Sequence, residues 1–136
     1  ASEQARFADT HARVGILPGW GLSQKLSRLI GINRAREMSL TGNFIDAHRA
    51  EAWGLVNRVC NADELLTEAL SSAAQIAEAD PKAVFALKSL MNDGAKASLG
   101  DALDMEGERG NAFAKTVDYS QMGARLAALR QRAAKQ

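Results

Sequence analysis

The chain has 136 residues, of which 46% are hydrophobic and 24% charged, so it suits one globular domain and is unlike a disordered polypeptide. Its 17 basic and 16 acidic residues leave a formal charge of +1, which gives no reason to expect nucleic acid or a membrane surface as a partner. Cys60 is the only cysteine, so no internal disulfide can form. With no recognisable signal peptide and no apolar run of ~18 residues, a cytoplasmic location is expected.

The first expected elements flank a loop that is rich in glycine. Residues 5–16 mix polar and apolar side chains and predict a strand or extended segment that runs into this loop. Residues 19–21, Gly-Trp-Gly, then open a helix that Gly31 ends. The apolar residues of that helix recur at helical spacing and are Leu22, Leu26, Leu29 and Ile30.

The next stretch of the chain predicts short elements only. Asn33 can cap a short helix, and a turn at residues 41–43 leads into a brief extended segment. Asp46 is expected to cap another helix, which stops at Gly54. Residues 55–60 alternate in the manner of a short strand.

The remainder of the sequence indicates helices. Asn61 and Glu64 have the spacing of a capping box, and a long amphipathic helix follows them. Asp80 precedes a proline at the start of a second helix, and Ser98 can cap a third. An apolar stripe near the C-terminus indicates a fourth helix.

The chain therefore divides into a mixed, loop-rich segment, residues 1–60, and a helical segment, residues 61–136. The expected strands are too few and too short to form a sheet that is stable by itself. This imbalance predicts an incomplete domain, whose strands pair with segments that this chain does not contain.

The glycine loop lacks both common phosphate-binding motifs. The sequence GILPGWGLSQK has no Gly-Lys-Ser/Thr, and Gln24 stands where a dinucleotide fingerprint needs its third glycine. Two interpretations stay open on spacing alone: a loop that brings backbone N–H groups close to a ligand, or a tight turn.

Histidine is the residue beside this loop that can transfer a proton at neutral pH. His11 precedes the loop, and its imidazole suits acid–base chemistry, although a lone histidine more often has a structural role. His11 and His48 are far apart in the sequence and show no metal-ligand spacing, so no metal site is expected.

Two stretches of the sequence resemble a known family. FADTHARVGILPGWGLSQKLSRLIG and RAREMSLTGNFIDAHRAEAWGLVNRVC are similar to the second half of the enoyl-CoA hydratase/isomerase (crotonase) family. That family has an F-x-x-P-E segment, a G-x-x-P-G-x-G-G loop and an [LT]-G-x-x-[IF]-x-A-x-x-A-x-x-x-G-L-V block. The residues that fill this last block are Leu40, Thr41, Gly42, Ile45, Ala47, Ala50, Gly54, Leu55 and Val56.

The resemblance implies an α/β fold, a spiral of ββα units followed by a C-terminal helical trimerisation region. Residues 1–60 would be the end of the spiral core and residues 61–136 the oligomerisation region, in a trimer or a dimer of trimers. The implied activity is that of an enoyl-CoA hydratase, a hydro-lyase of fatty acid metabolism, which adds water to a trans-2-enoyl-CoA thioester. The acyl-CoA is the substrate, and no cofactor is implied.

The resemblance also implies a set of site residues. His11 occupies the position of the second catalytic glutamate, and Thr10 replaces the proline before it. The residues expected to border the acyl pocket are Leu17, Pro18, Gly19, Trp20 and Gly21. The first catalytic glutamate and the oxyanion-hole amides belong to the part of the family that precedes this match, so the 136-residue chain alone is expected to be inactive.

Imidazole cannot carry the negative charge of a glutamate, so two other functions remain alternatives. One is another acyl-CoA reaction of the same fold, double-bond isomerisation or thioester hydrolysis, with His11 as the base. The other is a non-catalytic chain whose helices serve assembly. The C-terminal segment also departs from the family pattern, because Arg125 and Ala128 replace a phenylalanine and a lysine.

Overall fold

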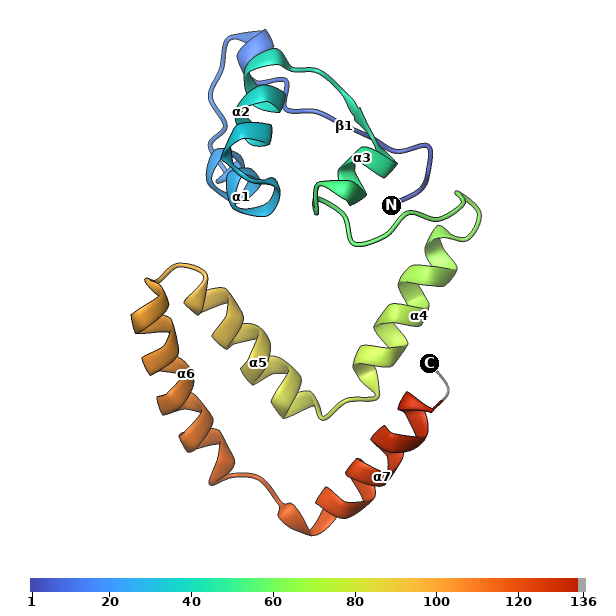
Figure 1. The fold of residues 1–136 in the computed structure, drawn as a ribbon, viewed down its shortest axis with the longest axis vertical. Coiled ribbons are helices and arrows are strands. Elements are labelled where there is room, and N and C mark those ends of the chain that lie inside the picture. The colour runs from blue at the N-terminus through green and yellow to red at the C-terminus, as the bar shows by residue number, and fades with distance from the viewer. Residues whose placement is uncertain (135–136) are drawn as a thin grey trace. The chain divides into compact units, whose positions relative to one another are not determined.

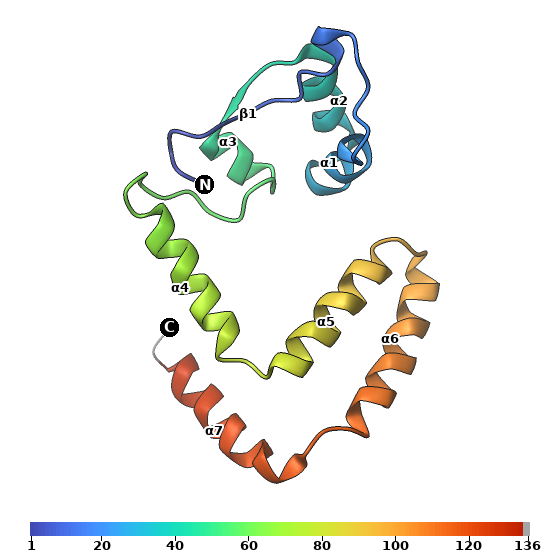
Figure 2. The same cartoon turned by 180° about the vertical axis from the view of Figure 1, so that it is seen from behind.

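The computed structural model describes residues 1–134 of the chain, with Gln121 described by its backbone alone. The chain divides into two compact units, Ala1–Ile76 and Ala77–Gln136. Figures 1 and 2 show their helices and strands from opposite sides. Within residues 1–134, no helix is both long enough and apolar enough to cross a membrane.

The first unit combines very short strands with short helices. Its elements in chain order are β1 (Arg6–Phe7), η1 (Ala12–Val14), α1 (Leu22–Ile30), α2 (Ile32–Thr41), β2 (Ile45–Asp46), α3 (Ala47–Ala52) and α4 (Leu65–Ala77), whose last residue opens the second unit. The strands β1 and β2 are antiparallel, with Phe7 opposite Ile45. A pair of two-residue strands cannot be stable alone, as the sequence predicted.

The core of the first unit lies where α1 and α2 pack side by side, as both views show (Figures 1 and 2). Its buried cluster consists of Leu26, Ile30, Ala35, Met38, Ile45 and Ala50. Leu26 and Ile30 are buried as their spacing predicted, whereas Leu29 is 58% exposed. The apolar face of α1 that reaches this core is therefore narrower than expected.

Glycines in the left-handed backbone region end the first two helices. Gly31, with φ 84°, separates α1 from α2, so α2 begins at Ile32 and the predicted cap Asn33 lies inside the helix. Gly42, with φ 64°, ends α2, and its N–H donates to the carbonyl of Met38 at 2.9 Å. This arrangement is an αL cap, which a residue with a Cβ adopts only with strain.

Three of the predicted helix caps are present. Asp46, Asp80 and Ser98 each accept a hydrogen bond from the backbone N–H three residues further on, at 2.7, 3.1 and 3.2 Å. The predicted capping box at Asn61 is wrong, because its side-chain amide donates to the Glu64 carboxylate at 2.9 Å and caps no backbone N–H. A cap depends on neighbouring residues alone, which is why most of these predictions hold.

Two predicted extended segments take other conformations. The segment after β1 turns into η1 and ends at Gly15, with φ 75°, so the expected strand does not continue to Ile16. Residues 55–60 form no strand, and only Cys60 makes an isolated bridge, to Ser2. Alternation favours a strand only where a second strand pairs along its length, and here residues 1–3 pair only with the end of the segment, at Arg58 and Cys60.

The second unit is helical in all its regular elements within residues 77–134, which are α5 (Pro81–Gly94), α6 (Leu99–Ala114), η2 (Tyr119–Gln121) and α7 (Met122–Ala133). Asp93 on α5 pairs with Arg109 on α6 at 2.8 Å, and Asp80 pairs with Arg125 on α7 at 3.1 Å. No described residue of these helices or of α4 is buried. Their exposed apolar residues include Leu66, Leu70, Phe85, Leu87, Met91, Leu99, Leu103 and Leu129.

Candidate active site

His11 lies in the turn between β1 and η1, in the first unit, and is the residue that precedes η1. Its ring Nδ1 is 2.7 Å from Oδ1 of Asp9, and its backbone N–H donates to the same oxygen at 3.2 Å. The two side chains are 14% and 4% exposed. One buried carboxylate oxygen therefore holds both the backbone and the ring of His11.

Asp9 is the buried polar residue of this unit, with 3% of its surface exposed. Burial by itself raises the pKa of Asp9, but hydrogen bonds from Ser39 on α2 and from His11 outweigh it and hold that pKa below its ordinary value of 3.8. Asp9 is therefore an ionised carboxylate at neutral pH, and an ionised carboxylate only accepts hydrogen bonds.

Trp20 contacts His11 from the glycine loop. The two rings meet edge to face, with their centroids 5.0 Å apart and their planes at 63°. Such an aromatic contact contributes about 0.5–1.5 kcal/mol beyond the area that it buries. The loop therefore places one of the five predicted pocket residues directly on the candidate acid–base group.

Of the predicted pocket residues, Trp20 is the one whose ring contacts the imidazole, and the others lie along the same loop. Leu17 is 91% exposed, and Trp20 is 70% exposed, so both present apolar surface on the outside of the loop. Pro18 and Gly19 connect them. Gly21, with φ 89°, is the N-cap residue of α1, so a side chain there would strain the entry into that helix.

The turn that carries His11 is anchored to the end of α2. The guanidinium Nε of Arg13 donates to the carbonyl of Thr41. A Cβ on Gly42 would lie 2.5 Å from Cγ of Arg13, so only glycine leaves room for this side chain. The carbonyl of His11 also accepts the N–H of Ile16 at 3.1 Å, which holds the start of the glycine loop.

Sequence reasoning found His11 and the loop but missed Asp9 and Ser39. A signal for Asp9 does exist, because an aspartate two residues before a histidine can accept that residue's N–H in an Asx turn. Nothing in the sequence marks Ser39, which the packing of α2 brings to the carboxylate. The sequence therefore signals a turn at Asp9, and the structure adds the burial of its carboxylate and the contact with Ser39.

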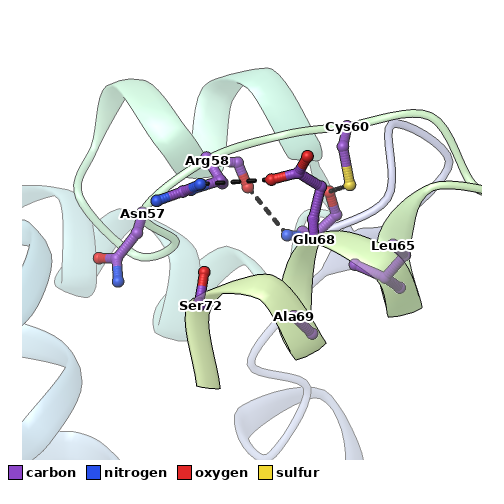
Figure 3. Close-up of a pocket in the computed structure, with 8 residues that line it drawn as sticks. Asn57, Arg58, Cys60, Leu65, Glu68, Ala69 and Ser72 are labelled. Carbon is purple, nitrogen blue, oxygen red and sulfur yellow. Dashed lines mark hydrogen bonds and ion pairs between the residues drawn. The ribbon is translucent and has the colours of Figure 1, made fainter. Parts of the chain in front are cut away.

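A hollow lies between the start of α4 and the segment that precedes it (Figure 3). It has a volume of about 260 Å³ and is lined by Ala1, Asn57, Arg58, Cys60, Leu65, Glu68, Ala69 and Ser72. Its two charged side chains, Arg58 and Glu68, pair at 3.3 Å. None of the site residues predicted from sequence lines it, so it is distinct from the turn at His11.

Residues 1–134 contain no group of three His, Cys, Asp or Glu side chains placed to hold a metal ion. Cys60 is partly buried, with its thiol 3.6 Å from the carbonyl of Ala1. The candidate acid–base chemistry beside the glycine loop is therefore carried by side chains, with His11 and its partner Asp9 in direct contact.

Comparison with known proteins identifies relatives over nearly the whole chain. A family model described as enoyl-CoA hydratase/isomerase matches residues 1–129. A protein of Arabidopsis thaliana named "Probable enoyl-CoA hydratase 1, peroxisomal" is 50% identical over 113 residues, which are 83% of this chain and 43% of the relative. A "Short-chain-enoyl-CoA hydratase" of Clostridioides difficile is 39% identical over 106 residues, which are 78% of this chain and 68% of the relative.

Solved structures resemble the chain in the same way. The enoyl-CoA hydratase of Bacillus anthracis aligns with a TM-score of 0.85 and 33% identity, over 96% of this chain and 50% of that one. A putative enoyl-CoA hydratase of Thermobifida fusca in complex with acetoacetyl-CoA aligns with a TM-score of 0.78 and 28% identity, over 85% of this chain and 46% of that one. The chain spans about half the length of most of these relatives. These likenesses confirm the predicted fold class, including its incompleteness.

Proposed function

This chain belongs to the enoyl-CoA hydratase/isomerase family, and from that premise we propose that it is the C-terminal part of an enzyme that adds water to a trans-2-enoyl-CoA thioester. The names of its relatives and the acetoacetyl-CoA bound to the Thermobifida fusca protein support an acyl-CoA substrate. Residues 1–60 would end the spiral core, and residues 61–136 would form the oligomerisation region.

The observation that carries the proposal is the placement of His11. It stands at the motif position of the second catalytic glutamate, is held by a buried carboxylate and touches Trp20 of the glycine loop. Hydration breaks the C=C π bond and one O–H bond of water and forms one C–O bond and one C–H bond, with no net oxidation or reduction, so positioned proton donors and acceptors suffice and no cofactor is required. His11 would move one of the two protons, and Leu17, Pro18, Gly19, Trp20 and Gly21 would border the acyl chain.

The decisive experiment is an assay of the complete enzyme and its His11→Ala variant with trans-2-butenoyl-CoA. Loss of hydration supports the proposal. Retained hydration overturns the role of His11, and conversion to an isomerised or hydrolysed product instead identifies one of the alternative reactions. The oxyanion donors and the first glutamate would come from the part of the enzyme outside this chain. Residues 1–136 alone should therefore not hydrate the enoyl-CoA substrate.

Assembly and location are part of the same proposal. Large apolar side chains on α4 to α7 are 39–76% exposed, and broad apolar faces of this kind mark protein interfaces. We propose that self-association, as a trimer or a dimer of trimers, covers them. A single cysteine supports a reducing compartment such as the cytoplasm, although one relative is named peroxisomal.

A further inference from the structure

The contact between Asp9 and His11 is stronger than a turn requires. An Asx turn needs only the bond from the backbone N–H, which is 3.2 Å long. The ring nitrogen Nδ1 approaches the same oxygen more closely, at 2.7 Å, in the range of charge-assisted hydrogen bonds. Both side chains are largely shielded from water, so solvent screens the interaction between them only weakly.

The ionised carboxylate decides which ring nitrogen carries the proton. Because Asp9 can only accept, the Nδ1 that faces it must donate. In a neutral imidazole the other nitrogen, Nε2, is then the acceptor. The nitrogen Nε2 of His11 is therefore the ring atom that can accept a proton from water.

We propose that Asp9 is a positioning residue that fixes His11 in the Nδ1-protonated tautomer, and that the Asp9–His11 pair together replaces the single carboxylate of the family motif. The pair carries one negative charge while the imidazole is neutral, and it becomes neutral when Nε2 accepts a proton. A glutamate passes through the same two charge states. The substitution of histidine for glutamate therefore preserves the charge change of the site and moves the proton-accepting atom from oxygen to nitrogen.

The groups around the pair are consistent with this assignment. Ser39 on α2 supplies a further hydrogen bond to Asp9, and the Trp20 ring lies against His11. The nearby cation Arg13 is directed to the backbone carbonyl of Thr41. Among residues 1–134, His11 is the group whose charge acts on Asp9, so the imidazole is its electrostatic partner.

This inference rests on the proposed function, but its first test does not require turnover. In the complete enzyme labelled with ¹⁵N-histidine, a long-range ¹H–¹⁵N spectrum above neutral pH should show His11 with a protonated Nδ1 and an unprotonated Nε2. The exposed His48 gives an internal reference for an imidazole in solvent. A protonated Nε2 in the neutral ring overturns the inference, even if hydration does depend on His11.

The second test compares Asp9→Asn and Asp9→Glu with the exposed control Asp63→Asn, using trans-2-butenoyl-CoA. Asp9→Asn should lower kcat by about 10- to 10⁴-fold with little change in KM, because in a serine protease triad the equivalent change costs ~10⁴-fold through the wrong tautomer. Asp9→Glu should recover part of that loss, and Asp63→Asn should match the parent enzyme. An unchanged kcat in folded Asp9→Asn would overturn the inference while leaving the role of His11 intact. If Asp9→Asn does not fold, the ¹⁵N spectrum of the parent enzyme decides.

Discussion

The side chain of Arg13 packs against the α-carbon of Gly42. A Cβ on Gly42 would lie 2.5 Å from Cγ of Arg13. Arg13 lies two residues after the candidate acid–base group, and Gly42 ends α2. The absence of a side chain at Gly42 therefore lets the turn that carries His11 dock on the helix that also supplies Ser39 to Asp9.

Substitution of Gly42 should test this docking. Gly42→Ala combines a strained φ of 64° with the clash against Arg13, so we expect it to lower the free energy of unfolding by about 1–3 kcal/mol. Gly100→Ala is the matched control, because that position lies in the first turn of α6 and meets an added Cβ only at 3.9 Å. Urea unfolding of the two variants compares them directly, and equal midpoints would contradict the docking argument.

The assay of His11 benefits from a second histidine in the same chain. His11→Ala should lower turnover of trans-2-butenoyl-CoA by about 10²–10⁴-fold, the usual contribution of a positioned proton-transfer group. His48→Ala, on the exposed side of α3, should leave both turnover and folding unchanged. Equal activity of the two variants would mean that His11 only fills space beside Trp20.

The helical faces lead to a prediction about assembly. Leu103 on α6 is 58% exposed in the single chain, and the proposed self-association would bury it. Leu103→Asp should then shift the sedimenting species to a smaller size, because an unpaired carboxylate in an interface costs several kcal/mol. Asp104→Ala, the adjacent change, should have little effect. A well-folded monomer of the parent protein at micromolar concentration would refute the proposed assembly.

Local features of the fold were predictable from the sequence. Asp46, Asp80 and Ser98 cap helices where expected, since a cap depends on residues within one helical turn. Residues 55–60 were wrongly predicted as a strand, because a strand needs a partner and the pattern does not show whether one exists. The same pattern of orphan strands nevertheless predicted correctly that the domain is incomplete.

The candidate site was only half predictable. His11 and the loop at Trp20 follow from the motif, and a motif is a local property of the sequence. The role of Asp9 depends on its burial and on Ser39, which is thirty positions away and reaches the carboxylate only when α2 packs beside the turn. Charge and burial at a site depend on tertiary contacts, so a sequence can name a candidate acid–base group without naming its electrostatic partner.

Acid should weaken the second unit through Asp80. The N–H of Ala83 is the largest cause that holds the pKa of Asp80 below 3.8, and the charge of Arg125 adds to it. A group whose folded-state pKa is lowered stabilises the fold above its unfolded pKa, and this stabilisation disappears as the pH falls through the folded value. The stability difference between the parent and Asp80→Asn should therefore be constant from pH 7 to 5 and shrink below about pH 3.8. Urea midpoints across this range measure it, with Asp63→Asn as the control. A difference that grows in acid would have the wrong sign.

Restoring the family's glutamate should fail unless Asp9 also changes. His11→Glu places a second carboxylate next to the ionised Asp9, and like charges at this distance raise the pKa of one of them. The single variant should therefore hydrate trans-2-butenoyl-CoA more slowly than the parent enzyme near neutral pH. Adding Asp9→Asn removes the repulsion and leaves one carboxylate at the motif position, with an amide able to donate a hydrogen bond to it. We expect the double variant to exceed His11→Glu by at least about tenfold in kcat, the effect of one pKa unit on a group that must be ionised. If His11→Glu alone equals or exceeds the double variant, the charge of Asp9 does not act at this position.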